Sequence, residues 1–555
     1  MINKIDRISG TWFLGGIAAG AGAVAISLLL RIFIGGIFLP ELASQTLFSL
    51  TPGQVESQAV ESLGPIAKYS AFIGAVIANL VLYGLIGILL TTVQKKSLSL
   101  KGYLGNGMRS SLIAFIVLFI LGILLLALTE TDVQSKLNSI TVLTIYLIPS
   151  NIAFGFTLAY FYRNLISLRD SLSMVSKKET TASAAGRTEI DYKKRLLLRA
   201  GLASIVALPI LYFGLDSLLH PKKEAQQISP SLATLLRSRP KTPGFEDVRL
   251  KPLLDSEITP TDLFYRIDKN PIVPVVDSQS WNLTIKGLVD KPCVLNYKQL
   301  REMPSVEQFA TLECVSNKIG GDLISTAIWK GIHLKDLLEK AQVKQNAKYI
   351  VFRCSDGYDV GIPLERGLFE GTILAYDMNG SPLTSEHGYP VRAIVPGIYG
   401  MMNAKWLTEV ELVDDVYEGY WQRKGWSNIA THNTHSFIVL PGNAPVRKRF
   451  KDLEATNVPS NGLIPIAGIA FAGDRGISKV EVSTDGGATW KIAKIKDPLS
   501  QYTWVLWNAE LDLNSEKGNN HTIVVRATDK TGKIQTDMVA NPFPNGATGY
   551  HNISV

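Results

Sequence analysis

Cysteine is scarce in this sequence, and its copies are irregularly spaced. The 555 residues contain Cys293, Cys314 and Cys354, with no Cys-x-x-Cys pair and no haem-attachment motif. Irregular spacing excludes a disulfide framework and a tetrahedral zinc site. A Gly-rich phosphate loop is also absent. Of the three thiols, only Cys314 sits in a loop where chemistry could reach it.

Histidine is absent from the first 219 residues. All seven histidines lie at or beyond His220, whereas long uncharged runs dominate the sequence before Leu219. A haem held by two histidines within a membrane is therefore excluded, and with it a simple built-in electron path. Beyond Leu219 the composition is that of an ordinary soluble protein. The chain is long enough for three or four domains.

Long apolar runs are abundant, and five of them are candidates for helices that span a membrane. A bilayer core requires about 20 apolar residues of helix. The first four runs reach that length, and the first could continue past Arg31 to Leu39. The fifth is shorter and contains Asp216. The five runs cover residues 11–30, 70–93, 110–128, 137–162 and 200–219.

The charges in the connecting loops predict an orientation. Lys4 and Arg7 precede the first run, and the second and fourth loops are rich in Lys and Arg. The first and third loops instead carry acidic residues such as Glu41, Glu56 and Glu130. The positive-inside rule therefore places the N-terminus in the cytoplasm, and five crossings place the chain beyond residue 220 outside. This topology explains the net charge of +8 better than nucleic-acid binding does.

Polar features within the apolar runs favour packing over transport. Gly16-x-x-x-Gly20 predicts close approach of a neighbouring helix. Arg31 and Asn79 could mark a pathway, but snorkelling and hydrogen bonding between helices are the favoured interpretation. A transporter with an outer sensor domain therefore rests on the five helices alone.

The fifth run has a basic lead-in, Lys-Lys-Arg-Leu-Leu-Leu-Arg, at residues 193–199. It resembles a twin-arginine export signal with Lys194 and Arg195 as the basic pair, which implies an outer part that folds before export. A plain cytoplasmic charge cluster explains the segment equally well. Residues 220–244 are expected to form a linker.

Beyond the linker the pattern is mixed α and β, and after residue 441 it is all β. Strands are predicted at 281–289 and 349–354 and an amphipathic helix at 334–341. Cys314 follows an apolar strand, in a loop with Gly320 and Gly321 that allows close backbone approach. By itself such a thiol is more often a small buried apolar residue than a soft metal ligand. Cys293 and Cys354 are interpreted as structural.

The last hundred residues show the alternation and turns of a β-sandwich. Strands are predicted at 479–483 and 521–529, with a hairpin turn at Asp485-Gly-Gly. Regularly spaced turns of this kind predict an immunoglobulin-like sandwich.

Spaced motifs occur in a fixed order between residues 263 and 441. They are Phe-Tyr-Arg-Ile-Asp-Lys-Asn at 264–270, Leu-Glu-Cys at 312–314 with Asn317, Ser-Thr-Ala-Ile-Trp-Lys-Gly at 325–331, Ser-Asp-Gly-Tyr at 355–358, Ala-Tyr-Asp-Met-Asn-Gly-Ser-Pro-Leu at 375–383, His-Gly-Tyr-Pro-Val-Arg at 387–392 and Ala-Lys-Trp-Leu at 404–407. This series resembles the molybdenum-cofactor domain of the sulfite oxidase family. The sandwich that follows is similar to the dimerisation domain of the same family.

The resemblance implies a molybdenum held by one pterin cofactor, by oxo or hydroxo groups and by one protein thiolate, here Cys314. Charge-assisted hydrogen bonds to the pterin or its phosphate are expected from side chains at matching positions. These are Arg266, His387, Arg392 and Lys405, with Tyr265, Asn317 and Asp356 as supporting candidates. Arg266 and Arg423 are also expected, with Cys314, at the reacting centre.

The sequence departs from the family at two cationic positions. Where sulfite oxidases carry arginines, this chain has Ile319 and Met402, and Arg423 stands where a tyrosine is expected. The implied activity is two-electron transfer of an oxygen atom on a small substrate. Reduction of S-oxides or N-oxides is the alternative, and a binding protein that keeps the fold without the chemistry is another.

The predicted organisation is multidomain. It comprises an α-helical transmembrane bundle (1–219), a linker (220–244), an α+β molybdenum-cofactor domain (245–440) and an all-β immunoglobulin-like domain (441–555). A multi-pass protein of the cell membrane is expected, with both outer domains extracytoplasmic. Its expected partners are the lipid bilayer, a small-molecule substrate, an external cytochrome or quinone-linked electron carrier and a second copy of the chain, with no nucleic acid.

Overall fold

The computed structural model describes residues 2–63, 66–92, 94, 98–128, 133–178, 211, 213–215, 243–270, 272–441, 463–512 and 522–554. Contacts between Cα atoms divide the chain into two compact units. Unit 1 comprises Met1–Thr51, Ser62–Lys222 and Lys269–Ile272. Unit 2 comprises Pro52–Glu61, Lys223–Asp268 and Val273–Val555.

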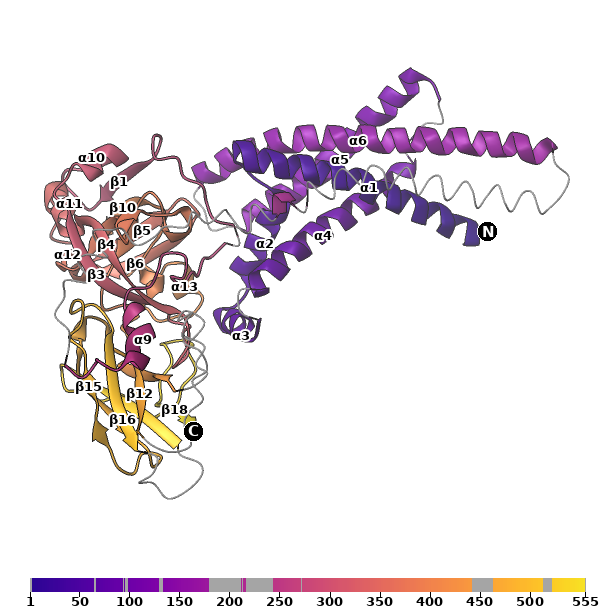
Figure 1. The fold of residues 1–555 in the computed structure, drawn as a ribbon. Coiled ribbons are helices and arrows are strands. Elements are labelled where there is room, and N and C mark those ends of the chain that lie inside the picture. Colours follow the sequence, from indigo (N-terminus) through magenta and orange to yellow (C-terminus); the bar gives the residue numbers. More distant parts are fainter. Residues whose placement is uncertain are drawn as a thin grey trace. The chain divides into compact units, whose positions relative to one another are not determined.

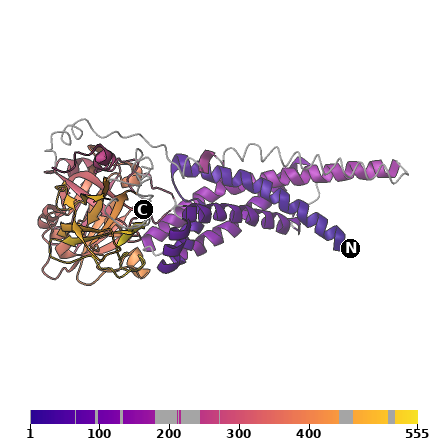
Figure 2. The same cartoon turned by 60° about the horizontal axis from the view of Figure 1, so that its bottom comes forward.

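Unit 1 is helical, and its helices run alongside one another (Figures 1 and 2). Their bounds are α1 Ile2–Ile34, α2 Leu39–Leu50, α4 Ile66–Leu89 with the 3₁₀ turn Leu90–Thr92, α5 Leu100–Ala127 and α6 Val133–Lys178. Four segments of these helices are long and apolar enough to cross a membrane, by length and composition. They are Gly10–Ile34, Tyr69–Thr92, Leu100–Ala127 and Ser139–Ser167.

Two glycines let α1 approach α4 closely, as the Gly16-x-x-x-Gly20 spacing predicts. A Cβ atom at Gly16 would lie 2.5 Å from the carbonyl oxygen of Tyr83, and one at Gly20 would lie 2.5 Å from the Tyr83 Cβ. Side chains at these positions would force the helices apart. The packing interpretation of the motif is therefore confirmed.

The first apolar run does not continue to Leu39 as one helix. Helix α1 ends at Ile34, and Gly35 and Gly36 follow with φ of 77° and 116°. Such positive φ values suit glycine and stop a right-handed helix. Just before this break, Arg31 Nε lies 2.8 Å from Glu41 Oε2 in α2. Arg31 is thus held by an ion pair between helices.

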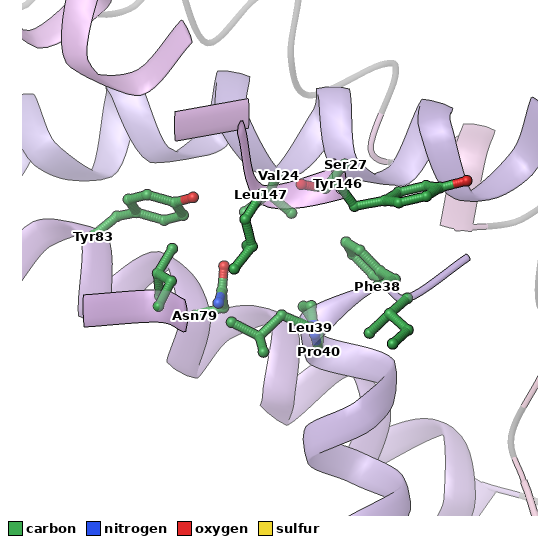
Figure 3. Close-up of a pocket in the computed structure, with 11 residues that line it drawn as sticks. Val24, Ser27, Phe38, Leu39, Pro40, Asn79, Tyr83, Tyr146 and Leu147 are labelled. Atoms are coloured by element: carbon green, nitrogen blue, oxygen red, sulfur yellow. The ribbon is translucent and has the colours of Figure 1, made fainter. Parts of the chain in front are cut away.

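A small cavity lies where α1, α2, α4, α5 and α6 meet (Figure 3). Its volume is ≈ 10 Å³, which is room for about one water molecule. Asn79 and Tyr83 of α4 and Tyr146 of α6 contribute polar atoms to its lining. Asn79 lines this cavity, and its predicted role in hydrogen bonding between helices stays a prediction.

The predicted fifth run, its basic lead-in and the linker lie almost entirely outside the described residues. Among the few described there, Leu211 is buried in the core of unit 1. A Cβ atom at Gly214 would lie 2.7 Å from Leu28 Cδ2 of α1. Residues 211 and 213–215 therefore pack against the helices of unit 1.

The mixed α+β region of unit 2 contains two sheets (Figure 1). One sheet has the order β2-β1-β10-β5-β6, and β1 pairs with β10 in parallel. The other has the order β3-β4-β7-β8, with β9 paired to β7. The strands are β1 Asn282–Gly287, β2 Cys293–Asn296, β3 Val306–Glu313, β4 Ile324–His333, β5 Tyr349–Cys354, β6 Asp359–Pro363, β7 Ile373–Met378, β8 Ser381–Pro382, β9 Arg392–Ile394 and β10 Leu407–Val413. Short helices between them are α9 Lys251–Asp255, α10 Tyr297–Arg301, α11 Leu334–Ala341, α12 Leu364–Leu368 and α13 Tyr420–Arg423.

Two four-stranded antiparallel sheets follow, with orders β11-β12-β16-β15 and β14-β13-β17-β18. Their strands are β11 His435–Leu440, β12 Leu463–Phe471, β13 Ile477–Ser483, β14 Lys491–Ile492, β15 Lys494–Ile495, β16 Val505–Asp512, β17 Thr522–Asp529 and β18 His551–Ser554. Ile466 and Trp507 of one sheet and Val480 and Val525 of the other belong to one buried cluster. The two sheets thus enclose a common core.

Helix α3 (Gly53–Leu63) contributes residues 52–61 to unit 2. Lys424, just after α13, donates a hydrogen bond of 2.8 Å to Glu56 Oε2. Both side chains are buried, at 8% and 7% exposure. A Cβ atom at Gly53 would lie 2.5 Å from the Lys424 carbonyl oxygen, so the start of α3 lies directly against this turn.

Candidate cofactor site

Cys314 opens the loop that joins β3 to β4, as predicted. Its backbone N–H donates to the Leu323 carbonyl at 2.9 Å, which closes the loop at its base. The Asn317 N–H donates to the Cys314 carbonyl at 2.9 Å, and the Ser316 hydroxyl lies 3.0 Å from Cys314 Sγ. The thiol is 7% exposed. Backbone and side-chain contacts therefore fix where the sulfur lies.

The other two cysteines have structural positions. Cys293 begins β2 and is partly buried against the main core of the mixed domain, and Cys354 ends β5 and is buried in that core. None of these three cysteines forms a disulfide bond within the described part of the chain. The prediction that Cys293 and Cys354 are structural agrees with this placement.

The predicted cations lie together with two acidic residues. Arg266 Nε lies 3.0 Å from Asp268 Oδ2, and its Nη1 lies 2.6 Å from Glu386 Oε1. Lys405 Nζ contacts the Asp268 carboxylate and donates to the Glu386 carbonyl at 3.2 Å. Two loops and Lys405, two residues before β10, thereby meet in one charged cluster.

His387 and Arg392 complete this cluster from a single turn. The 3₁₀ turn Ser385–His387 ends at Gly388, whose φ of 104° reverses the chain toward β9. A Cβ atom there would lie 3.1 Å from the Cβ atoms of both Arg392 and Lys405. Glycine is therefore needed where the two cationic residues converge.

Arg392 is a buried cation that forms no ion pair within 4 Å among the described residues, although the nearby Asp268 charge opposes the lowering of its pKa. Its Nη1 donates to the His387 carbonyl at 3.2 Å and its Nη2 to the Asn403 carbonyl at 3.4 Å, while Nε has no hydrogen-bond partner there. Burial lowers the pKa of Arg392 to about 10. A buried charge of this kind is costly unless an anion compensates it. Arg392 therefore fits a site for a phosphate-bearing ligand.

The same buried environment also lowers the pKa values of His387 and Lys405. Burial, with the Lys405 charge next, lowers the pKa of His387 to about 3, so its ring is neutral. The ring Nε2 lies 2.8 Å from the Thr261 carbonyl and donates to it. Burial also lowers the pKa of Lys405, although Asp268 opposes this. The cluster thus provides cations and a neutral imidazole at fixed positions.

Tyr265 connects the cations to the cysteine loop. Its N–H donates to Ser325 Oγ at 3.0 Å on β4. A Cβ atom at Gly400 would lie 2.2 Å from the Tyr265 hydroxyl and 3.1 Å from the Glu313 carbonyl. The residue before Cys314 and the residue before Arg266 therefore face the same glycine.

Three further predicted residues have other surroundings. Asn317 accepts the Leu323 N–H at 3.0 Å and so supports the Cys314 loop. Asp356 accepts the Tyr358 N–H at 2.9 Å in a turn after β5. Arg423 forms an ion pair with Asp359 at 3.0 Å and donates to the Glu418 carbonyl. These contacts tie Arg423 to β6 and α13 rather than to the cysteine loop.

Ile319 and Met402, the two positions that depart from the family pattern, have apolar side chains and lie among apolar residues. Ile319 packs against a core cluster that includes Phe437 and Leu440, and Met402 is 1% exposed within the core of the mixed domain. Met401, beside it, accepts the Tyr358 hydroxyl at its carbonyl, at 2.6 Å. Neither position supplies a positive charge.

Sequence reasoning missed the acidic partners and one hydroxyl. Asp268 lies within the motif at 264–270 and Glu386 stands next to His387. Nothing in the sequence indicated that these two acids pair with Arg266 and Lys405. The position of Ser316, two residues after Cys314, was the available signal for its contact with the sulfur.

A buried cation cluster beside a loop that carries one thiol defines a domain that binds an anionic, metal-bearing cofactor. Two family models match the chain over this region and beyond. The oxidoreductase molybdopterin binding domain matches residues 270–421, and the Mo-co oxidoreductase dimerisation domain matches residues 427–555.

Curated relatives agree with these matches. The sulfite oxidase of Arabidopsis thaliana is 29% identical over 340 residues, which cover 52% of this chain and 84% of the relative. The sulfite oxidase of Gallus gallus is 31% identical over 348 residues, which cover 54% of this chain and 75% of the relative. A solved structure, the sulfane dehydrogenase SoxCD from Paracoccus pantotrophus, is 24% identical, with a TM-score of 0.46 and coverage of 54% of this chain and 81% of that one.

The chain belongs to the sulfite oxidase family of molybdopterin-dependent oxidoreductases. It is therefore an enzyme whose cofactor is a molybdenum-bearing pterin. The resemblance deduced from the motif series is confirmed, and so is the sheet-rich cofactor domain followed by a β domain.

Proposed function

We propose that this enzyme transfers an oxygen atom to or from a small substrate outside the cytoplasm, from a domain anchored to the membrane. The convergence of Arg266, Arg392 and Lys405 beside the Cys314 loop carries the proposal, because it provides one thiolate and an anion-binding cradle together. When bound, the molybdenum centre supplies two-electron oxygen-atom exchange.

Each predicted residue then has a proposed task. Cys314 is the protein ligand of the metal. Arg392, Arg266, Lys405 and the neutral His387 hold the pterin and its phosphate by charge-assisted hydrogen bonds. Tyr265 and Asn317 fix the loops that carry these groups, and Asp356 supports a neighbouring turn. Arg423 keeps its assignment at the reacting centre as a proposal, although its charge is balanced by Asp359.

The substrate is proposed to be less anionic than sulfite. Ile319 and Met402 occupy positions where the family's sulfite oxidases carry cations, and both side chains lie among apolar residues. A doubly charged anion would lack those two partners. Reduction of S-oxides or N-oxides is therefore the second candidate, and the same two residues favour it.

The compact units support the proposed topology. Residues Pro52–Glu61 lie between the first two candidate spans, yet they belong to the unit that contains the catalytic domain. The Lys424–Glu56 ion pair lies within this unit. This association supports a location of the first outer loop and the catalytic domain on the same side of the membrane.

A parity argument then favours a fifth crossing. Three candidate spans, Tyr69–Thr92, Leu100–Ala127 and Ser139–Ser167, separate residue 61 from the catalytic domain. If each of the three crosses the membrane, they would leave the two regions on opposite sides, and a same-side arrangement would need one more crossing. The predicted run at 200–219 meets this need, and the packing of Leu211 and Gly214 within unit 1 supports it.

Topology is tested with a reporter enzyme that is active only outside the cytoplasm. Fusions after residues 61 and 441 are expected to be active, and fusions after residues 98 and 178 inactive. An inactive fusion after residue 441 beside an active one after residue 61 would overturn the fifth crossing.

The proposed organisation keeps four parts. They are the helical region (1–219), the linker (220–244), the cofactor domain (245–440) and the C-terminal β domain (441–555), and β11 contributes to a sheet of the C-terminal domain. We propose an immunoglobulin-like sandwich for that part, because its two antiparallel sheets share a core. The match to a dimerisation domain supports a homodimer. An external electron carrier completes the reaction cycle.

The decisive experiment is molybdenum and pterin content per chain in the wild type and in Cys314→Ala. Near one metal and one pterin in the wild type, with the metal spectrum altered or lost in the variant, would support the assignment. Sulfite and S-oxides are then compared by kcat/KM. Folded protein made in a competent host with neither component would refute it.

A further inference from the structure

A buried acid directly precedes the proposed metal ligand. The Glu313 side chain is 5% exposed and accepts a hydrogen bond of 2.9 Å from Asn317 Nδ2. Through its Oδ1, Asn317 also holds the Leu323 N–H, at the far end of the Cys314 loop. Asn317 therefore links the Glu313 side chain to both ends of the Cys314 loop.

The other side of Glu313 faces the C-terminal domain. His435, the first residue of β11, is 3% exposed, and its Nε2 lies 3.4 Å from Glu313 Oε1. Its Nδ1 lies 3.1 Å from the Asn433 carbonyl, so Nδ1 carries a hydrogen and Nε2 is directed at the acid. Among the described residues neither His435 Nε2 nor Glu313 Oε2 has an ordinary hydrogen-bond partner. The His435 ring and the Glu313 carboxyl group are therefore each other's nearest polar partner on this side.

We propose that His435 is a positioning residue for Cys314, acting through Glu313 and Asn317. The domain matched as a dimerisation domain thereby completes the active site, because the first strand of its sheet braces the loop that carries the metal ligand. This inference rests on the proposed function, in which Cys314 binds molybdenum.

Three variants of the full chain separate this role from general stability. His435→Leu removes the brace, whereas His435→Gln keeps an N–H donor at a similar distance from the backbone. Ser436→Ala is the matched control, because Ser436 is the next residue of β11, is equally buried and donates to Gln535 instead. Successive strand residues point to opposite faces, so this control leaves Glu313 untouched.

The first measurement uses protein produced without the pterin, and follows alkylation of Cys314 by peptide-resolved mass spectrometry. His435→Leu is expected to accelerate alkylation at least about tenfold, the factor expected when a buried polar group is left without its partner. His435→Gln and Ser436→Ala are expected to react at close to the wild-type rate. The second measurement is the Mo(V) electron paramagnetic resonance signal of the loaded protein, expected to change in His435→Leu and to recover in His435→Gln.

A wild-type alkylation rate and an unchanged signal in His435→Leu would overturn the proposal. Equal acceleration in Ser436→Ala would do so as well, because loosening of the domain would then explain the effect. Wild-type protein without molybdenum would refute the proposed function instead, and the alkylation comparison would still decide the role of His435.

Discussion

The hydroxyl oxygen of Ser316 lies 3.0 Å from the sulfur of Cys314. In the proposed site Cys314 binds the metal as a thiolate, which has no proton to donate, so Ser316 would be the donor there. A hydrogen bond to a ligand sulfur withdraws charge from it and is one of the means by which proteins set the potential of a metal. Ser316 is therefore expected to raise the reduction potential of the bound molybdenum.

Replacing Ser316 with Ala should lower that potential, because the sulfur regains electron density. Ser316→Thr keeps the hydroxyl and should restore the wild-type value. The measurement is a redox titration followed by the Mo(V) resonance signal, with molybdenum content determined in parallel. An Ala variant that holds full metal at an unchanged potential would contradict the assignment of Ser316 as donor.

His387 should make the cofactor-free protein sensitive to acid. Burial, followed by the Lys405 charge, lowers its pKa from 6.5 to about 3. Below pH 6.5 the unfolded chain therefore binds a proton that the folded chain does not, and stability falls as the pH falls toward 3. Between pH 6.5 and 5 this group is expected to remove about 2 kcal/mol from the free energy of unfolding.

Denaturant unfolding at several pH values tests this expectation. His387→Gln should flatten the acid limb relative to the wild type. His551 has the same sign, because burial lowers its pKa to about 4, so His551→Gln should flatten the limb over a narrower range. Identical slopes in the wild type and His387→Gln would show that the neutral ring makes no such contribution.

Local periodicity predicted several elements with their boundaries. The helix predicted at 334–341 is α11, and the strand predicted at 349–354 is β5. The strands predicted at 479–483 and 521–529 correspond to β13 and β17, within two residues. Helix α11 buries residues at the period of one helical face, and the strands are short runs rich in apolar and β-branched residues; a sequence displays both patterns directly.

Long-range pairing was not readable in the same way. Arg266 and Glu386 are 120 residues apart, and Glu313 and His435 meet although the chain between them forms most of two sheets. A charged residue in a motif indicates that charge is needed but not which residue balances it. The end of α1 at Ile34 was also missed, because apolar residues continue through two glycines that stop the helix.

Arg392 should be needed for the cofactor and not for folding. Its buried guanidinium contacts two carbonyl oxygens and no carboxylate among the described residues. Arg392→Met should therefore leave the cofactor-free protein at least as stable, while pterin affinity falls by at least about tenfold through loss of a charge-assisted hydrogen bond. Pterin fluorescence after oxidation and denaturant unfolding provide the two readouts.

Arg353→Met is the matched control for this substitution. Arg353 pairs with Glu411 at 2.8 Å on the sheet of β5 and β10, so its loss removes an arginine of the same domain outside the cation cluster. Pterin content should stay at the wild-type value. A drop in Arg353→Met as large as that in Arg392→Met would mean that domain stability, and not the local charge, governs cofactor retention.

Glu56 and Lys424 should be strongly coupled, because each neutralises the other in a buried setting. Lys424→Met leaves the Glu56 carboxylate buried without its cation, which is expected to cost about 3–5 kcal/mol of unfolding free energy. The substitution also removes the ammonium group that lies 4.6 Å from the centre of the Tyr420 ring. The double variant Glu56→Gln/Lys424→Met should lose less than the sum of the single losses, as a double-mutant cycle by denaturant unfolding would measure.

The exposed pair Lys298–Glu302, at 86% and 63% exposure, should show coupling of at most about 0.5 kcal/mol. Strictly additive losses at Glu56 and Lys424 would mean that α3 does not dock through this pair, and the same-side argument for the first outer loop would lose its main support.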